Sequence, residues 1–133
     1  ALGREWIKKI ARLAKDLEKI NKETAIRLHD IADMVAALFK NFETDPKDLA
    51  TTDARRLIND HLPRAYRFID AYVTLAGSER LTDAEKEKLL AMEEKISTIK
   101  DSFSKHLEGF RNSDFNALAV EGETMETIYN LDI

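Results

Sequence analysis

The densest group of chemically capable side chains lies between residues 53 and 67. Four arginines and one histidine occur there in a stretch rich in polar groups. A guanidinium group pairs well with phosphate or carboxylate, so these side chains could form an anion-binding cluster. The simpler interpretation, which we favour, is that the arginines pair with acidic side chains of neighbouring helices. The residues of the candidate anion site are Arg55, Arg56, His61 and Arg64.

Other catalytic patterns are missing from the sequence. It has no cysteine, no glycine-rich phosphate loop, no Gly-x-Ser-x-Gly turn and no His-Glu-x-x-His motif. His29 and Asp33 are four residues apart and could share a helix face, but a catalytic metal normally needs a third ligand. We therefore predict no metal site and no cofactor, and we expect the histidines to be surface or boundary residues.

The elements that would position these groups are helices. Apolar residues recur at intervals of three and four from Trp6 to Phe42, which is the spacing of one helix face. This predicts a helix over residues 4–43, about 60 Å long at 1.5 Å per residue. The pattern slips between Leu17 and Leu28, so a break near Asn21, with this residue capping a second helix, is the alternative. We prefer the continuous helix because the stripe does not change face abruptly.

Turn and cap signals predict three more helices. Asp45-Pro46 begins a helix over about 46–76, with a kink near 59–62 because Pro63 removes a backbone hydrogen bond. Thr82 to Glu85 has the spacing of a capping box and begins a helix over 83–111. Asn112-Ser113-Asp114 is predicted to break this helix before a short one over about 118–130. The sequence thus predicts one all-α domain, an elongated, coiled-coil-like antiparallel bundle of three long helices and a short C-terminal helix.

The first predicted helix is longer than its neighbours by about two to three turns, so its beginning should project past the bundle. An apolar stripe exposed in this way usually has a partner. We expect that partner to be a second copy of the chain or another helical protein. The predicted interface consists of Trp6, Ile7, Ile10, Leu13 and Leu17.

Charge is unevenly distributed along the chain, whose net charge is −4. Residues 1–20 carry six basic and three acidic side chains, whereas residues 113–133 carry five acidic side chains and no basic one. Two solvated faces are the simplest explanation, and the alternative is that the basic start lies near an anionic surface such as lipid headgroups. No stretch is apolar enough to span a bilayer. We expect no nucleic-acid partner, because the chain is acidic and lacks repeated basic and aromatic residues.

A series of short motifs gives the chain a resemblance to a known family. The motifs are Asp45-Pro46-Lys47, Ala54-Arg55-Arg56, Leu62-Pro63, Tyr66 and Asp70-Ala71-Tyr72, followed by Glu93 to Phe103, Phe110 and Met125. Over about residues 25–133 they resemble the XpaC-like family of bacterial proteins, which is labelled for 5-bromo-4-chloroindolyl phosphate hydrolysis. Leu57 and Ile58 replace the family's Phe-Leu, and His61 stands where an aromatic residue is common.

The resemblance implies an all-helical domain more firmly than it implies an activity. It implies hydrolysis of a phosphate ester, but no catalytic residue carries over to this sequence. It also implies membrane segments before the domain and a TelA-like toxic-anion-resistance protein as a helical partner. The predicted function is a non-enzymatic interaction or scaffold domain, cytoplasmic and held at the membrane face through an upstream segment. The alternative is a phosphatase or phosphate-binding accessory protein.

Overall fold

The computed structural model of the protein describes residues 3–131, with side chains from residue 3 to residue 112. Every regular element in this part of the chain is helical, and no strand occurs in it, so the predicted all-α class is confirmed. The elements are α1 (Arg4–Leu17), α2 (Lys22–Thr44), α3 (Pro46–Leu49), α4 (Thr52–Arg56), the π-helical turn η1 (Leu57–His61), α5 (Leu62–Ala76) and α6 (Asp83–Leu131).

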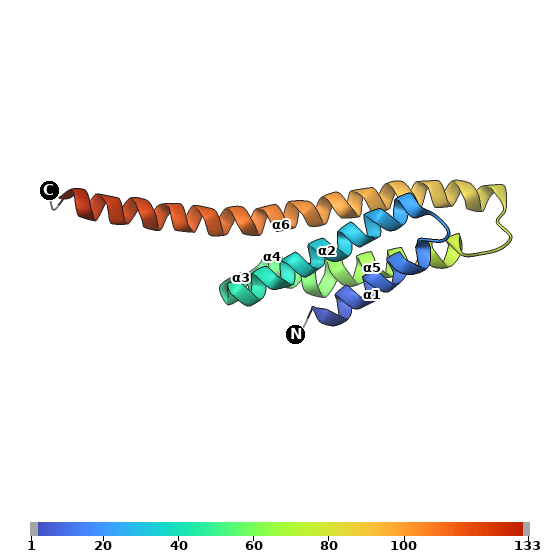
Figure 1. The fold of residues 1–133 in the computed structure, drawn as a ribbon, viewed down its shortest axis with the longest axis horizontal. Helices are drawn as coiled ribbons and strands as arrows, with labels where there is room; N and C mark the ends of the chain where they lie inside the picture. The colour runs from blue at the N-terminus through green and yellow to red at the C-terminus, as the bar shows by residue number, and fades with distance from the viewer. Residues whose placement is uncertain (1–2, 132–133) are drawn as a thin grey trace.

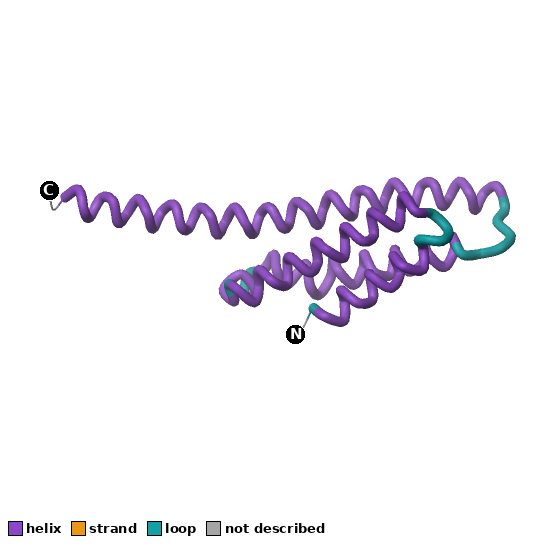
Figure 2. The backbone as a smooth tube through the Cα atoms, viewed as in Figure 1, coloured by secondary structure: helices purple, strands orange, loops and turns teal. Residues whose placement is uncertain are grey.

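Four long helices, α1, α2, α5 and α6, form a bundle in which α1 and α5 run in one direction and α2 and α6 in the other (Figure 1). Each packs against two neighbours, in the order α1, α2, α6 and α5 around the bundle. The links from α1 to α2 and from α5 to α6 lie at the same end, and the short helices α3 and α4 lie at the opposite end (Figure 2). The prediction of three long helices and one short helix is therefore wrong. The first predicted helix is divided into α1 and α2, and the last two predicted helices form the single helix α6.

The continuous helix predicted over residues 4–43 is broken between Leu17 and Lys22. Asn21 has extended backbone angles, φ −147° and ψ 94°, and its side-chain oxygen accepts a hydrogen bond from the Thr24 amide at 3.2 Å. This is the N-cap that the alternative interpretation placed here. Ile20, which continues the apolar stripe in the sequence, lies in the turn and is 49% exposed. Apolar spacing alone did not show the break, because α1 and α2 each bury apolar residues at intervals of three and four.

The predicted projection of the first helix is also wrong. After the turn, α1 lies against α2 and α5, and its apolar face forms part of the core. Ile10 and Leu17 are fully buried, and Leu13 is buried as well. Trp6 is half-buried and contacts Tyr66 edge to face, with 5.8 Å between the ring centroids. Ile7 also packs against the core. The stripe assigned to a partner is thus covered by the chain's own helices.

The helix predicted over residues 46–76 is divided. Ala50 and Thr51 separate α3 from α4, and the Thr51 hydroxyl caps α4 by accepting a hydrogen bond from the Ala54 amide at 3.1 Å. The irregularity predicted near Pro63 is present as η1, in which the Leu62 amide donates to the carbonyl five residues earlier. Pro63 has no amide hydrogen, so it cannot donate the hydrogen bond that an α-helix would form at this position. A π-helical turn accommodates the missing bond without reversing the chain.

The last two predicted helices form one, α6. Its start is confirmed, since the Thr82 amide donates to Glu85 Oε1 at 3.0 Å and the Glu85 amide donates to Thr82 Oγ1 at 3.1 Å. The hydrogen bond from the Thr82 amide to the carboxylate also lowers the pKa of Glu85. The predicted break at residues 112–114 is wrong, because Asn, Ser and Asp each cost a helix at most about 0.7 kcal/mol relative to alanine, whereas proline costs about 3.

Candidate functional site

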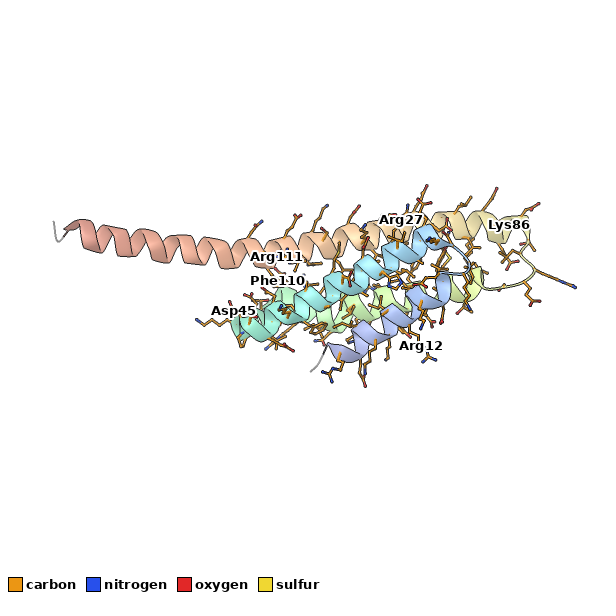
Figure 3. The ribbon with its side chains drawn as sticks, in the orientation of Figure 1. Arg12, Arg27, Asp45, Lys86, Phe110 and Arg111 are labelled. Atoms are coloured by element: carbon orange, nitrogen blue, oxygen red, sulfur yellow. The ribbon has the colours of Figure 1, made fainter. Side chains whose placement is uncertain are left out.

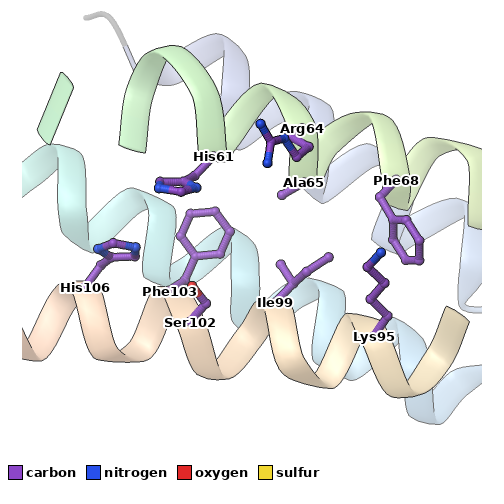
Figure 4. Close-up of a pocket in the computed structure, with 9 residues that line it drawn as sticks. All are labelled: His61, Arg64, Ala65, Phe68, Lys95, Ile99, Ser102, Phe103 and His106. Carbon is purple, nitrogen blue, oxygen red and sulfur yellow. The ribbon is translucent and has the colours of Figure 1, made fainter. Parts of the chain in front are cut away.

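A cavity of about 190 Å³ lies between α5 and α6, beside the π-helical turn (Figure 4). We call it the histidine pocket. One wall comes from η1 and α5 and the other from α6, so its two sides are at least 27 residues apart in the sequence. The lining residues are His61, Arg64, Ala65, Phe68, Lys95, Ile99, Ser102, Phe103 and His106.

Two histidines meet at one end of the pocket. The His61 and His106 rings have centroids 5.6 Å apart and planes inclined at 36°. The pKa of His106 is lowered from 6.5, first because the ring is partly buried and second because it faces His61. Asp53 on α4 acts in the opposite direction. A neutral imidazole at this place can accept one hydrogen bond and donate another near neutral pH.

Two cations lie along the remainder of the pocket, over an apolar floor. Arg64 pairs with Asp60 on its own helix at 2.8 Å, and both side chains are exposed. The Lys95 ammonium lies 5.0 Å from the centroid of the Phe68 ring. Ala65 and Phe103 are buried beneath these groups. Apolar surface next to positive charge is the combination that an aromatic anion would require.

The structure brings together only part of the candidate anion site. His61 and Arg64 line the histidine pocket, whereas Arg55 and Arg56 are exposed on α4 and do not line it. Arg64 pairs with an acid of its own helix and not of a neighbouring one. Sequence analysis missed Lys95 and His106, because helix positions alone do not indicate which faces of α5 and α6 meet.

A second polar cluster joins three helices near the turn between α1 and α2, within about one helical turn of Phe68 and Lys95. The Tyr72 hydroxyl and the Asn21 amide each donate to Glu93 Oε1 at 2.8 Å. Burial and the hydrogen bond to Glu93 raise the pKa of Tyr72 to about 12. All three side chains have partners, and no unsatisfied buried polar side-chain atom occurs among those described. We therefore assign this cluster to the fold and not to a reaction.

Three further observations concern metal binding and membranes. Among the described side chains, no three His, Asp or Glu groups converge as a metal site. His29, which the sequence offered as a ligand, has its Nε2 2.7 Å from Glu18 Oε1. None of the described helices combines the length and apolar character that crossing a membrane would need.

Fold and site define a helical-bundle domain with a pocket that is positively charged at its edge and aromatic within. The family model described as 5-bromo-4-chloroindolyl phosphate hydrolysis protein matches residues 4–125. The chain belongs to this family, XpaC, as the resemblance indicated. Comparison with curated proteins and with solved structures gives no significant match.

The lowered pKa of His106 predicts that the domain loses stability in acid. The unfolded chain takes up a proton at this residue near pH 6.5, and the folded protein does so only at lower pH, so stability falls as pH drops below 6.5. We expect urea unfolding between about pH 7.5 and about pH 5 to show a smaller loss of stability for His106→Gln than for the parent. An identical pH dependence of the two proteins would contradict this.

Proposed function

We propose that this domain is a non-enzymatic helical interaction domain, and that residues 113–131 of α6 are its partner-binding element. The observation that carries the proposal is that α6 continues well beyond the other helices of the bundle (Figure 1). The last buried side chain described on α6 is Phe110, whose ring centroid lies 5.1 Å from that of Phe42 near the end of α2. Phe110 and Arg111 mark this position in Figure 3.

A helical segment of this length without packing partners is only marginally stable in water. Its sequence has a residue pattern that another helix could stabilise, with apolar residues and one glycine at intervals of three, four, three and four. This spacing is typical of helices that pack in coiled coils. The repeat consists of Phe115, Leu118, Gly122, Met125 and Tyr129.

We propose a second copy of the chain as the first partner to test, with a helical protein of another kind, such as the TelA-like protein that the family resemblance suggests, as the alternative. Residues 113–133 contain five acidic side chains and no basic one, so a partner helix with basic flanks would be complementary. Two identical acidic segments repel, and self-association should therefore strengthen as salt is added.

Self-association can be tested on the full chain. The double variant Leu118→Glu and Met125→Glu places charges within the apolar repeat, and we expect it to weaken the dimer at least about tenfold in sedimentation velocity. Thr124→Glu adds a charge to the same segment outside the repeat, and it should leave the dimer intact. A parent protein that stays monomeric at about 0.1 mM, whatever the salt, would contradict self-association.

A second function, binding and hydrolysis of a phosphate ester, is favoured by the histidine pocket together with the family description. In this proposal an aromatic group lies against Phe68 and Phe103, and Arg64 and Lys95 bind the phosphate oxygens. His106, neutral and within the pocket, is the group placed to accept or donate a proton.

The purified full chain should then hydrolyse a chromogenic aryl phosphate. His106→Gln should lower turnover by about a hundredfold, in the range usual for loss of a general acid or base. Arg55→Gln, which changes an exposed arginine outside the pocket, should leave turnover unchanged. No turnover above a buffer blank, with several divalent metals supplied, would remove this second function.

A further inference from the structure

A straight row of positive side chains runs along the outer face of α1. Arg4, Lys8, Arg12 and Lys15 are spaced by four, four and three residues, and Lys19 follows in the turn after the helix. All five are exposed. We call them the α1 basic ridge. Figure 3 shows Arg12 on the side of α1 that faces away from the bundle.

The buried residues of α1 lie on the opposite face. Ile10, Leu13 and Leu17 are in the core, so the apolar side of this amphipathic helix is already used by the fold. The ridge from Arg4 to Lys15 is about 16 Å long at 1.5 Å per residue. It therefore presents charge to the outside without offering an apolar surface that could insert into a partner.

The ridge is distinguished by the regular spacing of its positive residues and not by a lack of ion pairs, since Lys47 and Lys86 also form none in the described part of the chain. Arg27 pairs with Glu23 at 3.2 Å and Arg64 with Asp60 at 2.8 Å, each with an acid four residues before it. No ion pair involves a ridge residue within the described part of the chain. Like charges four residues apart repel along a helix. Glu5, Asp16 and Glu18 lie three or four residues from ridge residues and offset part of this repulsion, and an external layer of negative charge would relieve the remainder.

A row this long suits an extended array of anions better than one compact ligand. A shallow hollow beside Arg4 and Lys8, between α1 and α2, adds Lys40 and Glu43 to its lining, but it includes only two of the five ridge residues. Nucleic acid is disfavoured by the net charge of −4 and by the absence of an exposed aromatic residue within the ridge. An anionic lipid leaflet requires neither a groove nor shape complementarity, and clusters of four to eight Lys and Arg residues are its usual protein counterpart.

We propose that the α1 basic ridge docks this domain on the surface of an anionic lipid bilayer. The contact is electrostatic and does not insert, because the apolar face of α1 remains in the core. It uses a different surface from the α6 interaction, and neither depends on the other. Binding should require negatively charged lipid and should weaken steeply as salt screens the charges.

The test is sedimentation of the full chain with lipid vesicles. We expect binding to vesicles containing about one third phosphatidylglycerol, little binding to pure phosphatidylcholine, and release between about 0.05 M and about 0.5 M salt. The triple variant Lys8→Gln, Arg12→Gln and Lys15→Gln should lose about a hundredfold in affinity. Its stability to urea should be close to that of the parent, because all three residues are exposed and form no ion pair with any described side chain, and this separates lost binding from lost folding.

The matched control is Lys47→Gln, Lys86→Gln and Lys88→Gln, which removes three exposed positive charges elsewhere. It should bind anionic vesicles nearly as well as the parent. Equal losses in the two triple variants, equal binding to neutral vesicles, or no sedimentation at low salt would each overturn the proposal. Binding of soluble polyglutamate through the ridge, without binding of vesicles, would also overturn it and would indicate an acidic protein partner.

Discussion

The fold depends on the hydrogen bonds of Asn21. Its side-chain oxygen caps α2 through the Thr24 amide, and its side-chain amide reaches Glu93 on α6, which also accepts from Tyr72 on α5. One residue thus begins a helix and joins it to two others. Because the chain turns here, α1 returns alongside α2 and fills the fourth place in the bundle, and a stripe that would otherwise need an external partner becomes core.

The same turn decides which surfaces remain for binding. With the apolar face of α1 buried, its exposed side carries the α1 basic ridge together with Glu5 and Asp16. On the other side of the bundle, α6 is longer than the helices it packs against, so the far end of this helix lacks the neighbours that its first half has (Figure 1). The two surfaces differ in character, since one is a fixed row of positive charge and the other an acidic helix with a regular apolar repeat.

The sequence predicted the local structure better than the long-range packing. The capping box at Thr82 and Glu85 and the Asp45-Pro46 start were predicted correctly, because each depends on residues within one turn. Where a kink was predicted before Pro63, the structure has a π-helical turn. The break at Asn21 was only an alternative, since the contact that favours it comes from Glu93, far along the chain. Two of the four residues of the candidate anion site line the histidine pocket for a similar reason. His61 and Arg64 are close in sequence, whereas Lys95 and His106 reach the pocket only through the packing of α5 against α6.

The claim that α1 folds back on α2 can be tested by one distance. Lys8 and Lys40 are exposed and line the same hollow, and the chain has no cysteine of its own, so the pair Lys8→Cys and Lys40→Cys can carry two spin labels. The full chain, diluted with unlabelled protein, would be measured by pulsed electron spin resonance. In a continuous straight helix, residues 8 and 40 would be about 48 Å apart, at 1.5 Å per residue. The bundle described here predicts a distance between the two labels of about half this value or less. A single distance near 48 Å would show that residues 4–43 form one helix and would contradict the account.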